Sequence, residues 1–144
     1  MVGAHAMKLV ALVFLAIAGF GLWVRLAPSD PARWHITAGD SGNRDFAGAL
    51  IRTIPAGPGD VSRLDRIIRA TPRTTVLAGT PEQGMVTYVT RSNIWGFPDY
   101  TTVEARQGQL VIHARLRFGS SDMGVNRARV TQWIAALEAG QGQA

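Results

Sequence analysis

Cysteine is absent from all 144 residues of the chain. The protein therefore has no disulfide, no thiolate nucleophile, no cysteine-ligated zinc or iron–sulfur site and no lipid-modified cysteine. This absence does not identify a redox compartment, because cysteine-free proteins occur on both sides of a bacterial membrane.

Lysine is almost absent as well, since Lys8 is the single example and arginine supplies the rest of the 15 basic residues. Against 10 acidic residues, the formal net charge is +5. This balance is compatible with phosphates, anionic lipids or acidic glycans as partners. A composition rich in arginine, alanine and glycine also follows from a GC-rich genome, so the charge alone does not assign a partner.

Catalytic motifs are missing too. The three histidines (His5, His35 and His113) are scattered, and none belongs to a metalloprotease, nucleophile-elbow or phosphate-binding motif. We therefore expect no metal and no cofactor. The basic charge is not accompanied by a nucleic-acid-reading motif, so we do not expect nucleic acid as a partner. A pair of carboxylates from Asp99 and Asp122 remains open, because only a structure shows whether they meet.

A long apolar run follows Lys8. Residues 9–24 read LVALVFLAIAGFGLWV without a charge. As a helix this run spans about 24 Å at 1.5 Å per residue, and it can extend a little further before Pro28 stops it. We predict an N-terminal tail over residues 1–8 and a transmembrane anchor over residues 9–27.

A cleaved signal peptide is the alternative for this run, because Met7 and Lys8 ahead of an apolar stretch also begin such peptides. The cleavage sites are poor. The small residues at 16–18 lie inside the apolar run, and a cut after Ala27 would place Pro28 just beyond the bond. We therefore favour a retained anchor, with Met7 as an alternative start of the chain.

The charges around the run give conflicting indications of orientation. Arg25, Arg33 and Arg44 follow it, and only Lys8 and the amino terminus precede it. The positive-inside rule would place the rest of the chain in the cytoplasm. The signal-like beginning favours the opposite side of the membrane.

The remaining residues are predicted to form one small α+β domain, a four-stranded antiparallel sheet with helices on one face. A tether over 28–45 precedes the domain, which covers 46–140, and a tail over 141–144 follows it. Glycine and proline accumulate in 36–60, so we expect irregular structure there that packs in places onto the domain. The expected elements are a helix over 60–70, strands over 74–78, 85–91, 100–105 and 109–118, and a helix over 123–138.

The fourth expected strand alternates clearly between two kinds of residue. Its even-numbered residues are apolar, and its odd-numbered residues include His113, Arg115 and Arg117. Alternate residues share one face of a strand about 7 Å apart, and two guanidinium groups beside an imidazole could hold a phosphate or a carboxylate. The alternative is a solvated sheet face whose cations pair with Glu104 or neighbouring acids.

Two further segments have both a structural and a functional interpretation. Ser120, Ser121 or Asp122 can cap the last helix, whose free amide groups also form an anion site, although capping alone explains these residues. The loop over 93–100 concentrates three aromatic residues around a glycine and a proline. It is either a tip that touches a membrane or a ligand, or a hairpin whose rings fold back onto the core.

Four stretches are typical of one family: PSDPARWH at 28–35, TYVTRS at 87–92, GFPDY at 96–100 and ARLRFGSSDMGVNR at 114–127. Together they resemble a bacterial family of uncharacterised proteins known as domain of unknown function 1499. The resemblance implies an envelope-associated domain, often behind an N-terminal apolar segment, without an established activity. It also draws seven residues into one set: Asp99, Arg117, Ser121, Asp122, Gly124, Asn126 and Arg127.

We therefore expect a single-pass protein of the bacterial inner membrane whose domain faces the periplasm and binds or scaffolds an anionic ligand, such as a lipid headgroup. The expected ligand-binding residues are His113, Arg115, Arg117, Ser121, Asp122, Asn126, Arg127 and Asp99. Two alternatives stay open. One is a hydrolase-like enzyme that uses Asp99, Asp122 and His113 converging in a pocket, and the other is a structural partner of another membrane protein.

Overall fold

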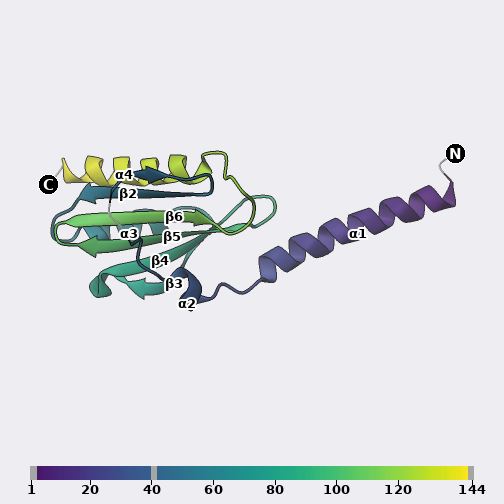
Figure 1. The fold of residues 1–144 in the computed structure, drawn as a ribbon, viewed down its shortest axis with the longest axis horizontal. Helices are drawn as coiled ribbons and strands as arrows, with labels where there is room; N and C mark the ends of the chain where they lie inside the picture. The colour runs from purple at the N-terminus through teal and green to yellow at the C-terminus, as the bar shows by residue number, and fades with distance from the viewer. Residues whose placement is uncertain (1–2, 40–41, 143–144) are drawn as a thin grey trace.

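A single apolar helix leads into an α+β domain in the computed structural model, which describes residues 3–39 and 42–142 (Figure 1). This helix, α1 (Ala4–Leu26), has 23 residues and is long and apolar enough to cross a membrane. It extends away from the domain, and its last turns approach the loops at one end of the sheet.

The domain is built on a six-stranded antiparallel sheet with the strand order β1-β2-β6-β5-β4-β3. Its strands are β1 (Arg44–Asp45), β2 (Ala49–Pro55), β3 (Thr74–Thr80), β4 (Met85–Arg91), β5 (Pro98–Arg106) and β6 (Gln109–Leu116). The helices after α1 are α2 (Pro31–Trp34), α3 (Asp60–Arg69) and α4 (Val125–Gln141), and a 3₁₀ turn covers Pro81–Gln83.

The sheet is larger than the four strands predicted from the sequence, and the additional strands are β1 and β2. Both lie in the segment that we expected to be irregular because of its glycine and proline. β2 pairs with β6 along its whole length, and its Leu50 and Ile51 are both buried, on opposite faces of the sheet. Pairing with β6, which is distant in the chain, stabilises β2 although glycine and proline accumulate in the segment around it.

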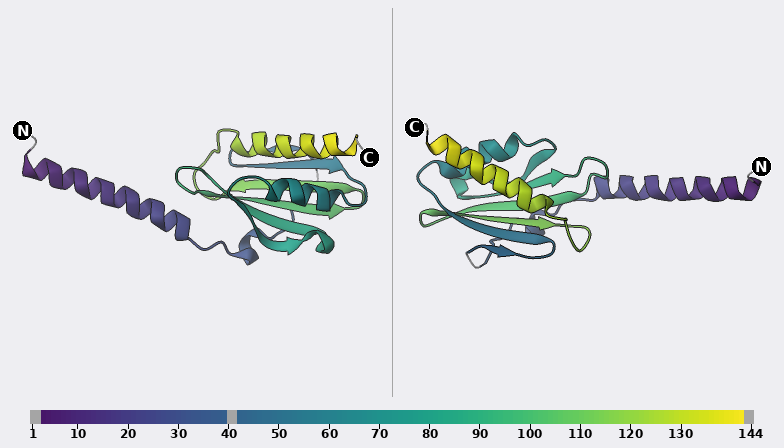
Figure 2. Two further views of the ribbon diagram at one scale, coloured as in Figure 1. Left: turned by 180° about the vertical axis from the view of Figure 1, so that it is seen from behind. Right: turned by 90° about the horizontal axis from the view of Figure 1, so that it is seen from above.

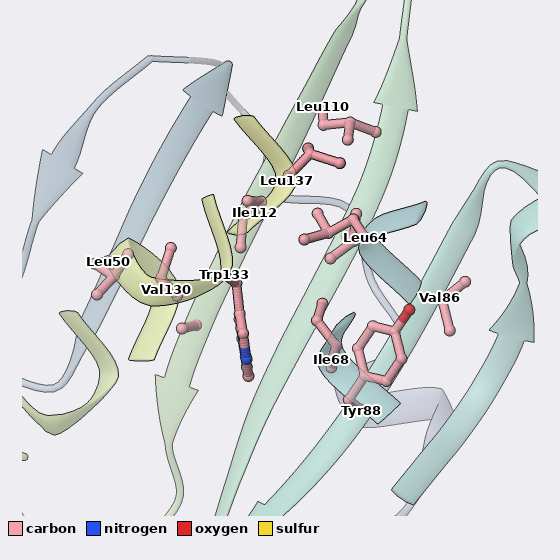
Figure 3. Packing of buried hydrophobic residues seen from close by; sticks show 12 residues of the cluster. Leu50, Leu64, Ile68, Val86, Tyr88, Leu110, Ile112, Val130, Trp133 and Leu137 are labelled. Atoms are coloured by element: carbon pink, nitrogen blue, oxygen red, sulfur yellow. The ribbon is translucent and has the colours of Figure 1, made fainter. Parts of the chain in front are cut away.

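The helices α3 and α4 pack side by side on one face of the sheet, as predicted (Figure 2). The core between helices and strands includes Leu50, Leu64, Ile68, Val86, Tyr88, Leu110, Ile112, Val130, Trp133 and Leu137 (Figure 3). Burying one such side chain contributes roughly 1.5–3 kcal/mol. The polar groups of the two buried aromatic residues are hydrogen-bonded. Trp133 Nε1 donates to Thr71 Oγ1, and the Tyr88 hydroxyl donates to Asp65, each at 2.8 Å.

The opposite face of the sheet is crossed by residues 28–39, which we call the covering segment. Its short helix α2 begins at Pro31, and the Asp30 carboxylate accepts a hydrogen bond from the Ala32 amide. The indole of Trp34 stacks on Tyr100 of β5 with ring centroids 3.8 Å apart. The covering segment therefore belongs to the folded domain as a packed element, and the central strands are shielded on this side too.

The two ends of the sheet differ in their surroundings. The loop Ser92–Phe97, the loop 117–124 and the start of α4 lie at the end next to α1, which we call the proximal end (Figure 1). The turn Gln107–Gly108 and the end of α4 lie at the opposite, distal end.

We expect the substitution Trp34→Ala to destabilise the full chain by about 3 kcal/mol, the usual cost of deleting a large buried aromatic side chain. The stack on Tyr100 is lost, and the covering segment loosens. Denaturant unfolding of the detergent-solubilised chain measures the loss. Trp95→Ala, on an exposed loop, is the matched control and should cost less than about 1 kcal/mol. Equal losses from the two variants would show that the covering segment does not contribute to the fold.

Candidate functional site

Arg115 lies under the covering segment and is only 9% exposed. Its Nη2 donates to the carbonyl oxygen of Trp34 (2.8 Å) and to Thr102 Oγ1 (2.7 Å). The guanidinium also lies 5.5 Å from the Trp34 ring centroid, within the range of a cation–π interaction. Among the described residues, Arg115 has no carboxylate partner and its Nε has no hydrogen-bond partner.

A line of polar side chains continues from Arg115 across the sheet. Thr102 Oγ1 lies 2.9 Å from Thr87 Oγ1, which in turn lies 2.9 Å from His35 Nδ1. The neighbouring strands β6, β5 and β4 thus contribute Arg115, Thr102 and Thr87 to one line of hydrogen bonds that reaches the covering segment. This network fixes the segment to the sheet at two successive residues, Trp34 and His35.

Arg117 holds the beginning of the covering segment. Its Nη1 donates to the Pro28 carbonyl oxygen (2.9 Å) and to the Tyr100 hydroxyl (3.2 Å), which lies 2.7 Å from Ser29 Oγ. The guanidinium also lies 5.2 Å from the Phe118 ring centroid. Both arginines of the predicted cationic strand face therefore bind groups of the protein itself.

Burial on this face disfavours positive charge. Desolvation lowers the pKa of Arg115 to about 10. Desolvation, together with the neighbouring Arg115 cation, lowers the pKa of His113 to about 4. His113 is therefore neutral near pH 7, and it offers no charge to an anion.

In the loop after β6, Asp122 caps the first turn of α4, and Ser121 stabilises the turn that precedes the helix. Asp122 accepts hydrogen bonds from the backbone amides of Gly124 (3.0 Å) and Asn126 (2.9 Å). Ser121 Oγ accepts one from the Met123 amide (3.2 Å). The Asp122 carboxylate thus occupies the position that an external anion would take at the start of this helix.

Arg129 connects the start of α4 to β5. Its Nη1 donates to Asn126 Oδ1 (2.8 Å) and lies 3.5 Å from Asp99 Oδ2. Burial raises the pKa of Asp99, the Arg129 cation opposes that rise, and the nearby Asp122 carboxylate adds to it. Asp99, Asp122, Asn126 and Arg129 therefore form one polar cluster.

A cavity of about 540 Å³ opens beside this cluster, between the domain and α1. Its apolar walls are Phe20, Phe97, Leu116, Phe118, Met123 and Val125. Its polar groups are Ser92, Asp99, Ser121 and Asp122. The cavity is therefore mainly apolar and has a polar side where β5 meets the start of α4.

The last turns of α1 pack on the loop Ser92–Phe97. Arg25 Nη2 donates to the carbonyl oxygen of Ile94 at 2.7 Å. Gly96 has a φ of +73°, and a Cβ at this position would lie 2.8 Å from Arg25 Cγ. Glycine therefore allows both the turn and the close approach of the helix.

A family model described as protein of unknown function, DUF1499, matches residues 27–137. The chain belongs to the DUF1499 family. The matched range includes the covering segment, the sheet and most of α4, so both faces of the sheet lie within the DUF1499 region. Most of α1 precedes it. The search of curated proteins found no match.

The ligand-binding residues predicted from the sequence divide into two groups in the structure. His113, Arg115 and Arg117 lie on the covered face, and Asp99, Ser121, Asp122 and Asn126 lie around the start of α4. Arg127 lies on the surface nearby and pairs with Asp45 at 3.0 Å. The sheet separates the first group from the second.

Asp99, Asp122 and His113 do not converge in one pocket, which is the arrangement that would favour a hydrolase. Asp99 and Asp122 line the same cavity, but His113 lies on the other face of the sheet, opposite Thr102. In residues 3–39 and 42–142, no three histidine, aspartate or glutamate side chains are grouped as metal ligands would be.

Sequence reasoning missed the residues that cover Arg115 and those that complete the cavity. Trp34 lies within the PSDPARWH stretch, and nothing in its local pattern indicates that it stacks on Tyr100. Phe20 lies in the apolar run predicted as the membrane anchor, and no local pattern distinguishes it from the lipid-facing residues around it. Neither contact is visible without the path of the chain across the sheet.

Acid is expected to destabilise the protein partly through His113. Its pKa is about 4 in the folded chain against an ordinary value of 6.5, so its contribution to stability is complete above pH 6.5 and is lost as the pH falls toward 4. His113→Leu removes this contribution and should flatten the profile between these values. Denaturation midpoints of the full chain in detergent across this range measure the effect. Parallel profiles for the variant and the original chain would contradict the assignment.

Proposed function

We propose that this chain is a single-pass envelope protein whose domain faces the periplasm and binds anionic lipid headgroups at the surface of the inner membrane. One observation carries the proposal: the end of α1, the loop Ser92–Phe97 and several exposed arginines all lie at the proximal end of the domain. A domain with its anchor, an aromatic loop and basic residues at one end would contact the bilayer through that proximal end.

Exposed apolar side chains at the proximal end support contact with a bilayer. Ile94 is 75% exposed and Met123 is 92% exposed. Trp95, which is also exposed, is a residue type typical of the membrane interface. Single exposed apolar residues are common on protein surfaces, but these gather beside an apolar helix.

Contacts between α1 and the domain support a retained anchor over a cleaved signal peptide. Val24 is fully buried, and the rings of Trp23 and Phe118 meet edge to face with centroids 5.8 Å apart. Cleavage after Ala27 would remove these contacts together with the hydrogen bond from Arg25. The periplasmic side is supported by the signal-like beginning of the chain and by the envelope association that the family resemblance implies.

A fusion of alkaline phosphatase to the C-terminus tests retention and orientation together in a bacterial host. We expect phosphatase activity in the membrane fraction, because this enzyme is active only outside the cytoplasm. A fusion to green fluorescent protein at the same position, which matures in the cytoplasm, should stay dark. Activity in the soluble periplasmic fraction would mean cleavage, and an inactive phosphatase with a bright fluorescent fusion would mean a cytoplasmic domain.

The headgroup contacts are assigned to arginines on the rim of the proximal end. Arg73 is exposed beside the end of β4, where its carbonyl oxygen accepts the Arg91 amide. Arg127 is exposed at the start of α4. Exposed guanidinium groups suit the oxygens of a phosphate, with which they make charge-assisted hydrogen bonds. Arg115 has no part in this contact, because it is enclosed under Trp34.

The double substitution Arg73→Gln with Arg127→Gln tests this assignment. The full chain is placed in nanodiscs of mixed phosphatidylglycerol and phosphatidylcholine. Native mass spectrometry then counts the lipids of each kind that stay bound to the chain when it is released from the nanodisc. Each arginine near an anionic surface contributes about 1 kcal/mol, so the preference for phosphatidylglycerol should fall roughly thirtyfold at low salt.

The matched control for this test is Arg63→Gln with Arg66→Gln. These residues lie on α3, so the control removes the same charge away from the rim. It should leave the preference within about twofold of the original chain. An original chain without a preference for phosphatidylglycerol, or equal losses from both double variants, would refute the headgroup proposal.

A further inference from the structure

We infer that the cavity between Phe20 and the start of α4 holds an acyl chain of a bilayer lipid. This inference rests on the proposed contact of the proximal end with the membrane. It does not depend on the charge of the lipid headgroup, so the two proposals can fail separately.

The depth of the cavity relative to α1 identifies a bilayer lipid as the occupant. Phe20 lies four residues before Val24, where the uncharged run ends, which places it about 6 Å inside that end of the helix. Its ring lies 6.3 Å from that of Phe97, and Phe97 lies 5.7 Å from Phe118. The cavity wall therefore reaches the level where hydrocarbon begins, and lipid tails are the apolar groups present at that level.

The volume and the walls of the cavity suit a hydrocarbon chain. Its volume of about 540 Å³ falls within the usual range for small-molecule sites, roughly 300–1,000 Å³. The walls combine three phenylalanine rings with Leu116, Met123 and Val125. Met123 lies at the rim of the cavity, where it is 92% exposed.

The polar groups of the cavity already have partners within the protein. Asp99 lies against Arg129, Asp122 accepts two backbone amides, and Ser92 Oγ accepts the amide of Phe97 at 3.0 Å. The carboxylates of Asp99 and Asp122 are therefore compensated by groups of the protein, without a bound cation. An uncharged chain therefore fits the cavity better than a charged ligand does.

The wall formed by the loop Ser92–Phe97 is suited to apolar surroundings. Arg25 binds the Ile94 carbonyl oxygen, and Arg91 Nη1 binds that of Gly96 at 2.9 Å. The Ser92 amide donates to the Phe97 carbonyl oxygen at 2.9 Å. Backbone groups that enter a bilayer must be paired within the protein, and these four groups of the loop meet that requirement.

Photo-crosslinking tests the inference with the full chain in phosphatidylcholine nanodiscs. The probe is phosphatidylcholine with a diazirine in its acyl chain, and mass spectrometry maps the adducts. We expect adducts on Leu116, Phe118 or Met123 as well as on lipid-facing residues of α1. Val125→Trp fills the cavity and should lower the domain adducts at least fivefold, with the α1 adducts unchanged. Ile94→Trp adds the same indole outside the cavity and should leave all adducts in place.

A second blocking variant, Met123→Trp, changes a residue at the rim that is 92% exposed, so the test does not depend on the folding of Val125→Trp alone. An original chain with adducts on α1 alone would overturn the inference. Domain adducts that persist in both blocking variants would also overturn it, because they would then come from surface contact. Loss of the cavity adducts together with an unaltered phosphatidylglycerol preference would support the cavity independently of the headgroup site.

Discussion

Arg115 is buried and bound to the backbone carbonyl oxygen of Trp34, and the arrangement around α1 depends on this contact. A buried cation is costly unless its hydrogen bonds and charge are compensated. Here a carbonyl oxygen, the Thr102 hydroxyl and the face of an indole provide the compensation. The same bonds hold the covering segment on the sheet, so removing either partner leaves the other unpaired inside the protein.

The attachment of the covering segment determines where α1 can lie. Only a few residues separate Leu26 from Trp34, so the helix must end close to the proximal end of the sheet. There Arg25, Gly96 and the aromatic rings form a second contact between helix and domain. Two attachments in succession give the domain a defined orientation relative to the helix, which a free tether would not.

The parts of the fold with a local pattern were predictable from the sequence. The alternation of β6 and the apolar stripe of α3 depend on neighbouring residues, and so does the capping by Asp122. β2 was not predictable, because Leu50 and Ile51 become a strand only by pairing with β6. The surroundings of the candidate site residues were only partly predictable for the same reason. Alternation placed Arg115 on a sheet face, but only the return of Trp34 across the sheet shows that this face is covered.

The central claim is that the proximal end of the domain rests on the bilayer. A single cysteine is a unique labelling position in this chain, which has none of its own. A fluorophore on Ile94→Cys, in the full chain reconstituted in liposomes, should be quenched by nitroxide-labelled lipid and protected from aqueous iodide. The same label on Gln109→Cys, at the distal end, should show the reverse. Equal access of iodide to both labels would contradict the claim.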